Sequence, residues 1–372
     1  MSASQHLVIL GTGSIAHRHA AEFAKIDGIT LAAAIDTDLV RAQEFADKHG
    51  IAAVFSSLEE AMAWNRFDAA VNATPDGVHY QTTMRLIEGR KAVFCEKPLA
   101  VNHKNALHMT EAAEQAGLIS MVNLTYRNAS AIQMARQLVE AGEIGTIRHV
   151  EASYLQSWLT GLHWGDWRTD PRWLWRLSSA HGSKGVLGDI GIHILDFVTF
   201  GTGLDINALQ ARMRTFNKAE NGIIGPYALD VNDSVAMTVE FGNGALGVVH
   251  MSRFATGNLN DLNLAIYGDK GALKIWANHE TSTLEVCLGA DIHTQTWKRL
   301  ECPATPRNEN RFADALFSGI NGEPNFRRGA EIQNLLDLCF ISDIEGRILP
   351  TRLDGRPSGS AIGSFESAGP LL

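Results

Sequence analysis

The clearest acid–base candidate in the chain is a carboxylate and an imidazole four residues apart, Asp189 and His193 in Gly-Asp-Ile-Gly-Ile-His. On a helix this spacing puts both side chains on one face. Imidazole titrates near neutrality, and a neighbouring acid orients the ring and raises its pKa, so the pair suits general acid–base catalysis. Two other interpretations stay open: half of a metal site, for which no further ligands with suitable spacing follow, and a hydrogen bond on a helix surface.

A lysine follows a short apolar run in Phe94-Cys-Glu96-Lys97-Pro98. Pro98 restricts the backbone of Lys97 to extended angles, which gives the side chain a defined direction. If the run is a parallel strand, the lysine lies at the carboxyl edge of the sheet, where ligands bind in open α/β folds. The alternative is a structural ion pair between Glu96 and Lys97.

A strand, a glycine-rich turn and a helix stand at the start of the chain, in Leu-Val-Ile-Leu-Gly-Thr-Gly-Ser-Ile-Ala over residues 7–16. Gly11 permits the tight turn, Gly13 lets the backbone approach a phosphate, and Ala16 keeps the helix close to its strand. The helix N-terminus offers unpaired N–H groups to an anion. We therefore predict a dinucleotide site whose pyrophosphate lies against Gly11, Thr12, Gly13, Ser14 and Ile15.

An aspartate, Asp36, ends the second apolar run, at 30–35. Such a residue can accept both hydroxyls of the adenine ribose, and its charge repels a 2′-phosphate. The sequence thus predicts NAD in preference to NADP. The alternative is that Asp36-Thr-Asp38 caps the helix that begins near Leu39.

Composition excludes several classes of function. The 372 residues are 45% hydrophobic and carry a formal charge of −9, without the clustered Lys and Arg that a nucleic-acid partner needs. The four cysteines are scattered, which predicts reduced core thiols and no metal site. Neither a basic leader nor an apolar run long enough for a membrane span is visible, so we expect a cytoplasmic protein.

Hydrophobic periodicity divides the chain into parts. Up to residue 124, short apolar runs at 7–10, 30–35, 52–55, 69–72, 92–95 and 118–122 alternate with amphipathic helices, which is typical of a parallel, helix-covered sheet. After Gly145, runs of period two dominate, including a hairpin at 235–250 around Gly242-Asn-Gly244. Further strands are predicted at 206–216, 262–267, 272–276, 283–288 and 294–300, a helix-rich insertion at 166–200, and helices at 311–320 and 330–345.

We therefore predict an α/β chain with three segments. Residues 1–124 form a Rossmann domain with a parallel sheet. Residues 125–350 form an α+β domain with a large, mostly antiparallel open sheet that binds substrate and mediates oligomerisation. Residues 351–372 form an irregular tail rich in Gly, Ser and Pro.

In their order and spacing, the motifs resemble the glucose-fructose oxidoreductase, inositol dehydrogenase and MocA (Gfo/Idh/MocA) family. The resemblance spans residues 7 to about 345. It rests on Gly11-Thr-Gly13 with Asp36, Thr74-Pro75 with His79, Glu96-Lys97-Pro98, and Asp189-x-Gly-x-His193. It implies an NAD-binding Rossmann domain and a second domain whose open sheet commonly forms the oligomer face, so a homodimer or homotetramer is expected.

The resemblance also implies roles for individual residues. Lys97 and Asp189 would hold the reacting hydroxyl, and His193 would remove its proton as hydride leaves for the nicotinamide. A nearby ammonium suits this chemistry because it stabilises charge that accumulates on the oxygen. The Lys97–Pro98 peptide bond is implied to be cis. Cofactor contacts are implied for Thr74, Pro75, His79, Glu96, Lys97, Asn123 and Arg127, although Arg127 could equally be a surface charge.

Tryptophans are concentrated between residues 158 and 175. Trp158, Trp164, Trp167, Trp173 and Trp175 are interleaved with His163, Arg168, Arg172 and Arg176. Indoles can cover the C–H face of a sugar ring while Arg and His bind its hydroxyls. Alternatively, the indoles pin an insertion onto the sheet. We expect substrate contacts from Lys97, Tyr126, Trp158, His163, Trp164, Arg168, Trp173, Arg176, Asp189 and His193.

The sequence thus predicts an NAD-dependent dehydrogenase that oxidises a secondary hydroxyl of a neutral sugar, anhydrosugar or cyclitol. Two alternatives belong to other classes. One is a glycoside hydrolase that retains NAD and cleaves by transient oxidation and elimination. The other is a non-catalytic sensor of sugar and nucleotide, against which the apparently complete set of Lys97, Asp189 and His193 counts.

Overall fold

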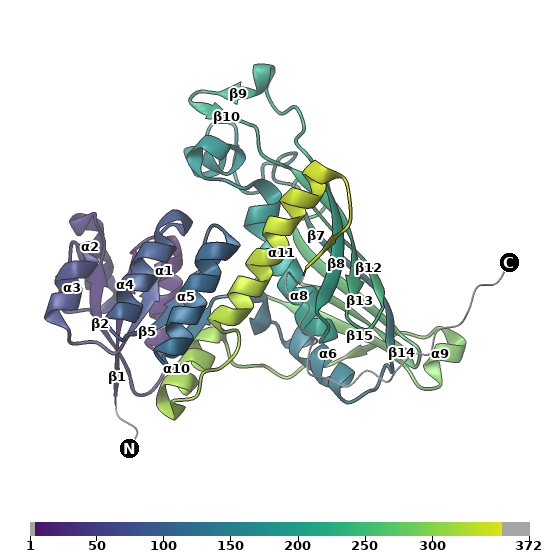
Figure 1. Ribbon diagram of the computed structural model, residues 1–372, viewed down its shortest axis with the longest axis horizontal. Helices are drawn as coiled ribbons and strands as arrows, with labels where there is room; N and C mark the ends of the chain where they lie inside the picture. The colour runs from purple at the N-terminus through teal and green to yellow at the C-terminus, as the bar shows by residue number, and fades with distance from the viewer. Residues whose placement is uncertain (1–3, 352–372) are drawn as a thin grey trace.

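The computed structural model describes residues 4–351 of the chain, and almost all of the predicted tail lies outside these residues. Within 4–351 the chain forms two large sheets, each with helices packed against it (Figure 1). None of the helices in that range is long and apolar enough to cross a membrane.

The N-terminal part is a six-stranded parallel sheet in the order β3-β2-β1-β4-β5-β6, the Rossmann order. This confirms the predicted parallel sheet. Its central strands are buried because helices cover both faces. The strands are β1 (Gln5–Leu10), β2 (Ile29–Ile35), β3 (Ala53–Phe55), β4 (Ala69–Asn72), β5 (Ala92–Cys95) and β6 (Ser120–Val122).

Five helices alternate with these strands: α1 (Ser14–Phe23), α2 (Leu39–His49), α3 (Leu58–Trp64), α4 (His79–Glu88) and α5 (His103–Gln115). The side chains of Asp38, Ser57 and Asn102 cap α2, α3 and α5 by accepting backbone N–H groups of the first turn. Helices α1 and α4 have no side-chain cap, and the residue before α1 is Gly13. The first N–H groups of α1 therefore remain available.

The C-terminal part is a nine-stranded sheet in the order β16-β15-β14-β13-β7-β12-β11-β8-β17. All neighbouring strands pair antiparallel except β7 and β12, so the predicted mostly antiparallel sheet is confirmed. The strands are β7 (Ile147–Gln156), β8 (Ile206–Arg214), β11 (Ser234–Phe241), β12 (Leu246–Ser252), β13 (Asn260–Gly268), β14 (Gly271–Ala277), β15 (Ser282–Leu288), β16 (Lys298–Leu300) and β17 (Leu349–Pro350).

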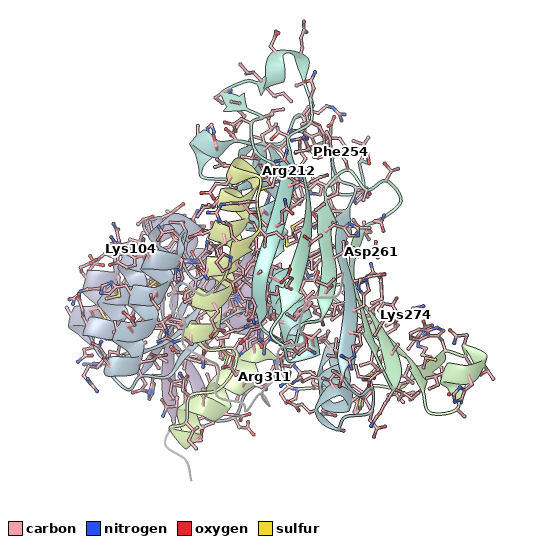
Figure 2. All side chains as sticks on the ribbon, turned by 45° about the vertical axis from the view of Figure 1, so that its right-hand side comes forward. Lys104, Arg212, Phe254, Asp261, Lys274 and Arg311 are labelled. Carbon is pink, nitrogen blue, oxygen red and sulfur yellow. The ribbon has the colours of Figure 1, made fainter. Side chains whose placement is uncertain are left out.

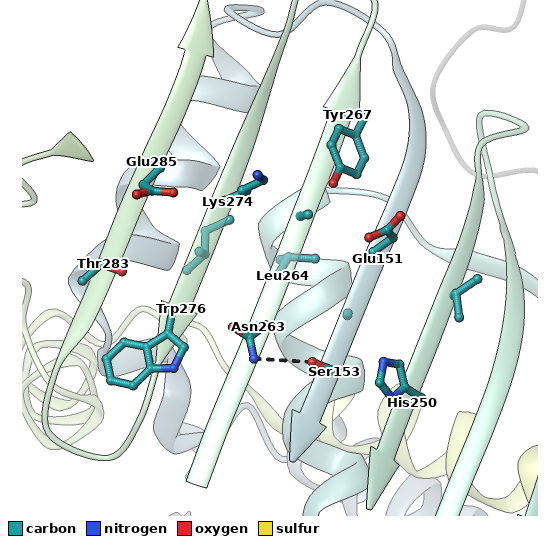
Figure 3. A pocket seen from close by; sticks show the side chains of 14 residues that line it. Glu151, Ser153, His250, Asn263, Leu264, Tyr267, Lys274, Trp276, Thr283 and Glu285 are labelled. Carbon is teal, nitrogen blue, oxygen red and sulfur yellow. Dashed lines mark hydrogen bonds between the residues drawn. The ribbon is translucent and has the colours of Figure 1, made fainter. Parts of the chain in front are cut away.

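Helices cover one face of this sheet and leave the other open. Helices α6 (Ser130–Glu140), α8 (Ile192–Thr202) and α11 (Phe326–Glu345) pack against it. The alternation along β11 explains the orientation, because Val235, Met237 and Val239 are buried while the residues between them are exposed. Figure 3 shows the open face, where side chains of β7 and β12 to β15 surround a shallow hollow of about 650 Å³.

One predicted strand is shorter than expected. Instead of a strand over 294–300, a short helix, α9 (Asp291–Thr294), precedes β16, and Gln295 ends that helix with a φ of 57°. The chain is thus turned before Lys298, and only three residues remain for pairing with β15.

The insertion before α8 has a core of its own. It contains the helix α7 (Pro171–Leu174) and three single turns, which are η3 (Trp175–Leu177), η4 (Ser179–His181) and the π turn η5 (Leu187–Gly191). A small hairpin of β9 (Ile223–Ile224) and β10 (Tyr227–Ala228) packs near it. Phe254, labelled in Figure 2, packs against this core from the end of β12. The buried residues of this core are Trp158, Leu159, Trp167, Leu174, Leu177 and Leu229.

The two parts share helices from the end of the described chain. Helix α10 (Asn308–Ser318) packs on α1, where Phe312 lies 6.2 Å from Phe23 and 5.5 Å from Phe94 between ring centroids. Helix α11 packs on both α5 and β8 and crosses between the sheets (Figure 1). Residue 124 therefore lies between the two sheets in the chain, but helices from after this residue pack against both parts.

Candidate active site

A cavity of about 1180 Å³ is lined from both parts of the chain. The N-terminal part contributes the start of α1 and the ends of β4 and β5. The C-terminal part contributes β7, the insertion, the start of α8 and two separate loops. The residues that line the cavity include Ser14, Ile15, Arg18, Thr74, Glu96, Lys97, Gln156, Trp158, Trp164, Trp173, Trp175, Arg176, Ser183, Lys184, Asp189, His193, Arg253 and His279.

The glycine turn has the geometry of a dinucleotide site. Gly11 has a φ of +84°, and a Cβ there would lie 2.7 Å from the carbonyl oxygen of Ala73, so only glycine fits between β1 and β4. A Cβ at Gly13 would meet nothing within 4 Å, which leaves open space before the uncapped α1. Ser14 and Ile15 of that helix line the cavity. These residues fit a pyrophosphate.

Asp36 lies beside this turn with both carboxylate oxygens occupied. It accepts the backbone N–H and the hydroxyl of Thr12, each at 2.8 Å, and Arg41 Nη2 at 2.6 Å. Burial alone would raise the pKa of Asp36, but the hydrogen bonds from Arg41, Thr12 and Asp38 hold it well below its usual value. The carboxylate is charged, as a ribose acceptor must be. Asp38, not Asp36, caps α2.

A buried ion triad that the sequence did not indicate lies behind Lys97. His19 of α1 donates from Nε2 to Glu96 at 2.7 Å and from Nδ1 to Glu309 of α10 at 3.0 Å. Burial opposes the charge of His19, but the two carboxylates raise its pKa to about 9. Burial also opposes the charge of Glu96 and would raise its pKa, but the hydrogen bonds from His19 and Asn123 lower that pKa to about 2. Glu96 therefore anchors the segment that carries Lys97.

Lys97 projects from the end of β5 toward the start of α8. Its Nζ donates to the backbone oxygen of Asp189 at 3.3 Å and lies 3.8 Å from Asp189 Oδ1. The Lys97–Pro98 peptide bond is cis, as the resemblance implied. His79 is buried behind this bond, and its ring bonds to the carbonyl oxygens of Pro98 and Thr74 at 2.7 and 2.8 Å.

The Asp189 carboxylate is surrounded by three cations. Arg253 donates to its Oδ2 at 2.9 Å and Arg176 to its Oδ1 at 3.2 Å, besides the ammonium of Lys97. Burial would raise the pKa of Asp189, but these charges hold it well below its usual value. Arg253 is fully buried and also donates to the backbone oxygens of Arg176 and Gly185. Asp76 also lines this end of the cavity and interacts with Lys97 and Arg176, so the cations face a second carboxylate.

His193 lines the same cavity, and its environment corrects one expectation. No hydrogen bond joins His193 to Asp189, although both lie within the described residues, because Asp189 is in the π turn η5 and the wider turn changes the angle between the two positions. The pKa of His193 is lowered to about 3, chiefly by burial and then by the Lys97 charge. Asp189 thus does not orient the ring through a hydrogen bond. Its charge raises the pKa of His193, but burial and the Lys97 charge outweigh this effect, so the imidazole is neutral.

The buried Nδ1 of His193 has no hydrogen-bond partner among residues 4–351. The ring of His193 packs edge-on against Tyr126 at 5.2 Å between centroids. Tyr126 lies behind the cavity wall, where Asn260 donates to its hydroxyl at 3.1 Å, so it supports His193 and does not reach a ligand. The structure thus places Tyr126 outside the cavity lining, whereas a substrate contact was expected.

Two further residues that were expected to contact substrate are also absent from the cavity lining of the described chain. Arg168 is exposed, lies over the Trp167 ring at 4.6 Å and pairs with Asp166 at 3.5 Å. His163 is exposed against the edge of Trp164 at 5.0 Å. Both lie on the outer side of the insertion. The remaining predicted aromatic and basic residues, Trp158, Trp164, Trp173 and Arg176, do line the cavity.

Several predicted cofactor contacts have structural partners instead. Arg127 is buried, donates to both carboxylate oxygens of Asp196 at 2.7 Å, and lies 3.9 Å from the Phe200 ring. Arg311, labelled in Figure 2, donates to the backbone oxygen of Arg127. Arg127 is therefore part of the junction between the sheets.

Asn123, His79 and Thr12 also have partners within the protein, and their predicted cofactor contacts stay predictions. Asn123 is buried and donates to Glu96 Oε1 at 2.7 Å, while Asn308 donates to its Oδ1 at 3.0 Å. His79 bonds to the carbonyl oxygens of Pro98 and Thr74 and so joins the loops after β5 and β4. Thr12 donates its backbone N–H and its hydroxyl to Asp36. Thr74 lines the cavity, and Pro75 follows it at an exposed position.

Sequence reasoning missed Arg18, Arg253 and His279, which line the cavity. His279 lies in the loop between β14 and β15 and stacks on Tyr126 at 5.4 Å between centroids. None of the three belongs to a motif, so no local signal could have found them. Within residues 4–351, no group of three or more His, Cys, Asp or Glu side chains could hold a metal ion.

A Rossmann sheet whose glycine turn opens into the same cavity as a lysine and a neutral imidazole is the arrangement of an NAD-binding oxidoreductase. Comparison with family models gives the same class. The model of the oxidoreductase family with an NAD-binding Rossmann fold, GFO/IDH/MocA, matches residues 5–124, and the model of the GFO/IDH/MocA C-terminal domain matches residues 132–274. The chain belongs to the Gfo/Idh/MocA family, which confirms the resemblance.

Named relatives include two sugar-related enzymes. Levoglucosan dehydrogenase from Pseudarthrobacter phenanthrenivorans is 29% identical over 237 residues, which are 59% of this chain and only 57% of that enzyme. D-glucoside 3-dehydrogenase from Escherichia coli is 27% identical over 92% of this chain and 96% of its own length. The structure of a levoglucosan dehydrogenase in complex with NADH and L-sorbose superposes with a TM-score of 0.82 at 21% identity, covering 94% of this chain and 99% of the other, which shows a shared fold.

Proposed function

We propose that the chain oxidises a secondary hydroxyl of a sugar, anhydrosugar or cyclitol, with NAD as the electron acceptor. The observation that carries the proposal is that Lys97 and His193, from two separate segments, line one cavity with Ser14 and Ile15 of the glycine turn. The names of the relatives support a carbohydrate substrate, since one acts on levoglucosan and another on D-glucosides.

His193 and Lys97 have different roles in the oxidation of the substrate hydroxyl. His193 is neutral at physiological pH, so it can accept the hydroxyl proton. A base with a pKa of about 3 is weak, and the alcohol must therefore be made more acidic by its surroundings. Lys97, with Arg176 and Arg253 nearby, supplies that positive potential in a partly buried site, where the Asp189 carboxylate pairs with all three cations.

The cofactor site is formed by the N-terminal part. The uncapped N-terminus of α1 would hold the pyrophosphate, and the Asp36 carboxylate the adenine ribose. When bound, NAD supplies the acceptor for the hydride that leaves the substrate carbon. In this arrangement Thr12 and Glu96 act as supports, because Thr12 fixes Asp36 and Glu96 fixes the backbone of Lys97.

A substrate panel tests the proposal. Polyols, aldoses, glycosides and anhydrosugars are incubated with the protein and NAD, or separately NADP, and nicotinamide absorbance is followed. Reduction of NAD with at least one of these substrates is the expected result. If none is oxidised, the proposed function is wrong. Cleavage of a glycoside without net reduction would instead support a hydrolase that retains NAD.

We also propose a homodimer or homotetramer formed through the open face of the nine-stranded sheet. That face carries exposed apolar side chains, including Leu246 and Val248 of β12, which are 57% and 42% exposed. Tyr267 and Trp276 lie on the same face (Figure 3). A second copy would remove this surface from water. A cytoplasmic location is proposed from the four cysteines, all of which are free thiols.

A further inference from the structure

An aromatic wall extends the cavity on the side of the insertion. Trp158, Trp164, Trp173 and Trp175 all line it. Trp173 is central, because its ring lies 5.3 Å from Trp158 and 5.8 Å from Trp164, and the planes of Trp164 and Trp173 differ by only 9°. Neither Lys97 nor His193 makes a ring contact with these indoles, so the wall is a surface additional to the acid–base residues.

Arg176 joins the wall to the reacting end of the cavity. Its guanidinium lies 4.7 Å from the Trp175 ring and 5.8 Å from the Trp173 ring, and the same group donates to Asp189 at 3.2 Å. Asp189 in turn lies 3.8 Å from the ammonium of Lys97. A group resting on the wall and a ring held at Lys97 would therefore be neighbours, with Arg176 between them.

The wall is held in place without a ligand. Trp158 is 3% exposed, donates from Nε1 to Gln156 at 3.2 Å, and lies 5.0 Å from the buried guanidinium of Arg253. The insertion behind it has its own core around Trp167 and Leu177. A rigid surface requires little ordering when a ligand binds.

One sugar ring would leave much of this surface in water. Trp164 and Trp173 are half-buried, and Trp175 is 36% exposed. Beyond the indoles, Ser183 and Lys184 also line the cavity. The Ser183 hydroxyl donates to the backbone oxygen of Arg176, and the Lys184 ammonium donates to that of Val101, which leaves two ammonium protons for a ligand hydroxyl. An apolar wall with a polar margin fits a second ring.

We propose that Trp164, Trp173 and Trp175 form a second subsite, which holds the ring-shaped aglycone of a glycoside while its sugar ring is oxidised at Lys97 and His193. The aglycone is a second sugar or an aryl group, both of which present a flat apolar face. The proposal rests on the proposed function. The glycosidic bond stays intact: the ring carbinol loses its proton to His193 and a hydride to NAD, and becomes a ketone.

A matched substrate series tests the subsite. Methyl and phenyl glycosides of glucose and galactose in both anomers, with cellobiose and maltose, are compared at saturating NAD. We expect the preferred two-ring substrate to have a kcat/KM about 2- to 13-fold above that of its methyl glycoside, since an aromatic contact is worth about 0.5–1.5 kcal/mol. Equal values for methyl and two-ring substrates would overturn the proposal.

Variants of Trp164 test whether the tryptophan wall causes the preference for two-ring substrates. In Trp164→Leu the ratio of two-ring to methyl kcat/KM should fall toward one, and Trp164→Tyr should restore it because a flat ring returns. The matched control is Trp297→Leu, a partly buried tryptophan between α9 and β16 outside the cavity, which should keep the wild-type ratio. An unchanged ratio in Trp164→Leu, with circular dichroism as in the wild type, would contradict the subsite.

Calorimetry separates this inference from the proposed function. Dissociation constants of phenyl and methyl glycosides are measured on the NAD-loaded protein and on Trp164→Leu. If no compound is oxidised, the proposed function fails, but tighter binding of the phenyl glycoside that disappears in Trp164→Leu would still support the subsite. If every compound binds equally, or none binds, the subsite is wrong.

Discussion

Arg253 holds Asp189 more closely than Lys97 does: the guanidinium lies 2.9 Å from the carboxylate, whereas the ammonium of Lys97 lies 3.8 Å away. Asp189 is thus placed as the counter-ion of a cationic cluster. The fully buried Arg253 comes from the end of β12 and joins the insertion to the start of α8 through the carbonyls of Arg176 and Gly185.

Replacement of Arg253 should therefore affect both stability and rate. In Arg253→Met the Asp189 carboxylate loses its closest partner, and we expect a loss of about 3–5 kcal/mol in the free energy of unfolding, as for other broken buried ion pairs. The kcat/KM should fall at least tenfold. Arg253→Lys should recover part of both. Urea denaturation and initial rates measure the two effects, and wild-type values in Arg253→Met would show that the contact is dispensable.

Removal of the imidazole separates chemistry from cofactor binding. We expect His193→Asn to lower kcat by about 10²- to 10⁴-fold, the usual contribution of a positioned acid–base group. NADH affinity, measured by fluorescence, should stay within about threefold, because the cofactor residues lie in the other half of the cavity. Full turnover in His193→Asn would exclude this histidine as the base.

The pair of Asp36 and Arg41 should control the choice between NAD and NADP. Arg41 neutralises the charge expected to repel a 2′-phosphate, and its side chain is 52% exposed. In Asp36→Ser, Arg41 loses this partner, so we expect NADH to bind at least tenfold more weakly and NADPH more tightly than in the wild type. The control is Asp47→Ser, an exposed position on α2 that accepts from Gln43 and makes no hydrogen bond or ion pair with Asp36 or Arg41 in the described part of the chain. An unchanged ratio of the two dissociation constants in Asp36→Ser would refute this role.

The buried triad around His19 should make stability fall with rising pH. The folded pKa of His19, about 9, is above its unfolded value of 6.5, so its contribution is complete below pH 6.5 and is lost as the pH rises toward 9. The difference corresponds to about 3 kcal/mol. Urea denaturation at pH 6.5 and 9 should show this loss in the wild type and a much smaller one in His19→Gln. An equal loss of unfolding free energy in the wild type and in His19→Gln would mean that His19 is not charged.

The open sheet face can be tested with a single charge. Val248 is 42% exposed on β12, and Val248→Glu should shift the protein toward monomers in sedimentation velocity, since a buried unpaired carboxylate is unfavourable. Val40→Glu, at an exposed apolar position on α2, is the matched control and should leave the assembly unchanged. A monomeric wild type would contradict the proposed interface.

Much of the fold was predictable because it depends on local patterns. The six parallel strands follow uninterrupted apolar runs, and the hairpin of β11 and β12 follows strict alternation. Strand β7 was not predicted, although it lies in the middle of the second sheet. Its alternation is broken at the start, where the buried Ile147 and Val150 are three residues apart.

The site was predictable only in part. Lys97, Asp189 and His193 carry motif signals and meet in one cavity. The contacts of Arg253 with Asp189 and of His19 with Glu309 join residues 64 and 290 positions apart, and no spacing rule reaches that far. The expectation that Asp189 orients His193 was wrong because the π turn between them leaves no mark in the residue pattern.

The contact between α10 and α1 has a consequence for biosynthesis. Strands β1 to β6 are translated before α10, so Phe312 and Glu309, which complete the packing and the charge balance around α1, leave the ribosome well after the strands that they support. The nascent nucleotide-binding part must therefore wait for α10, and until then His19 and Glu96 lack their third partner.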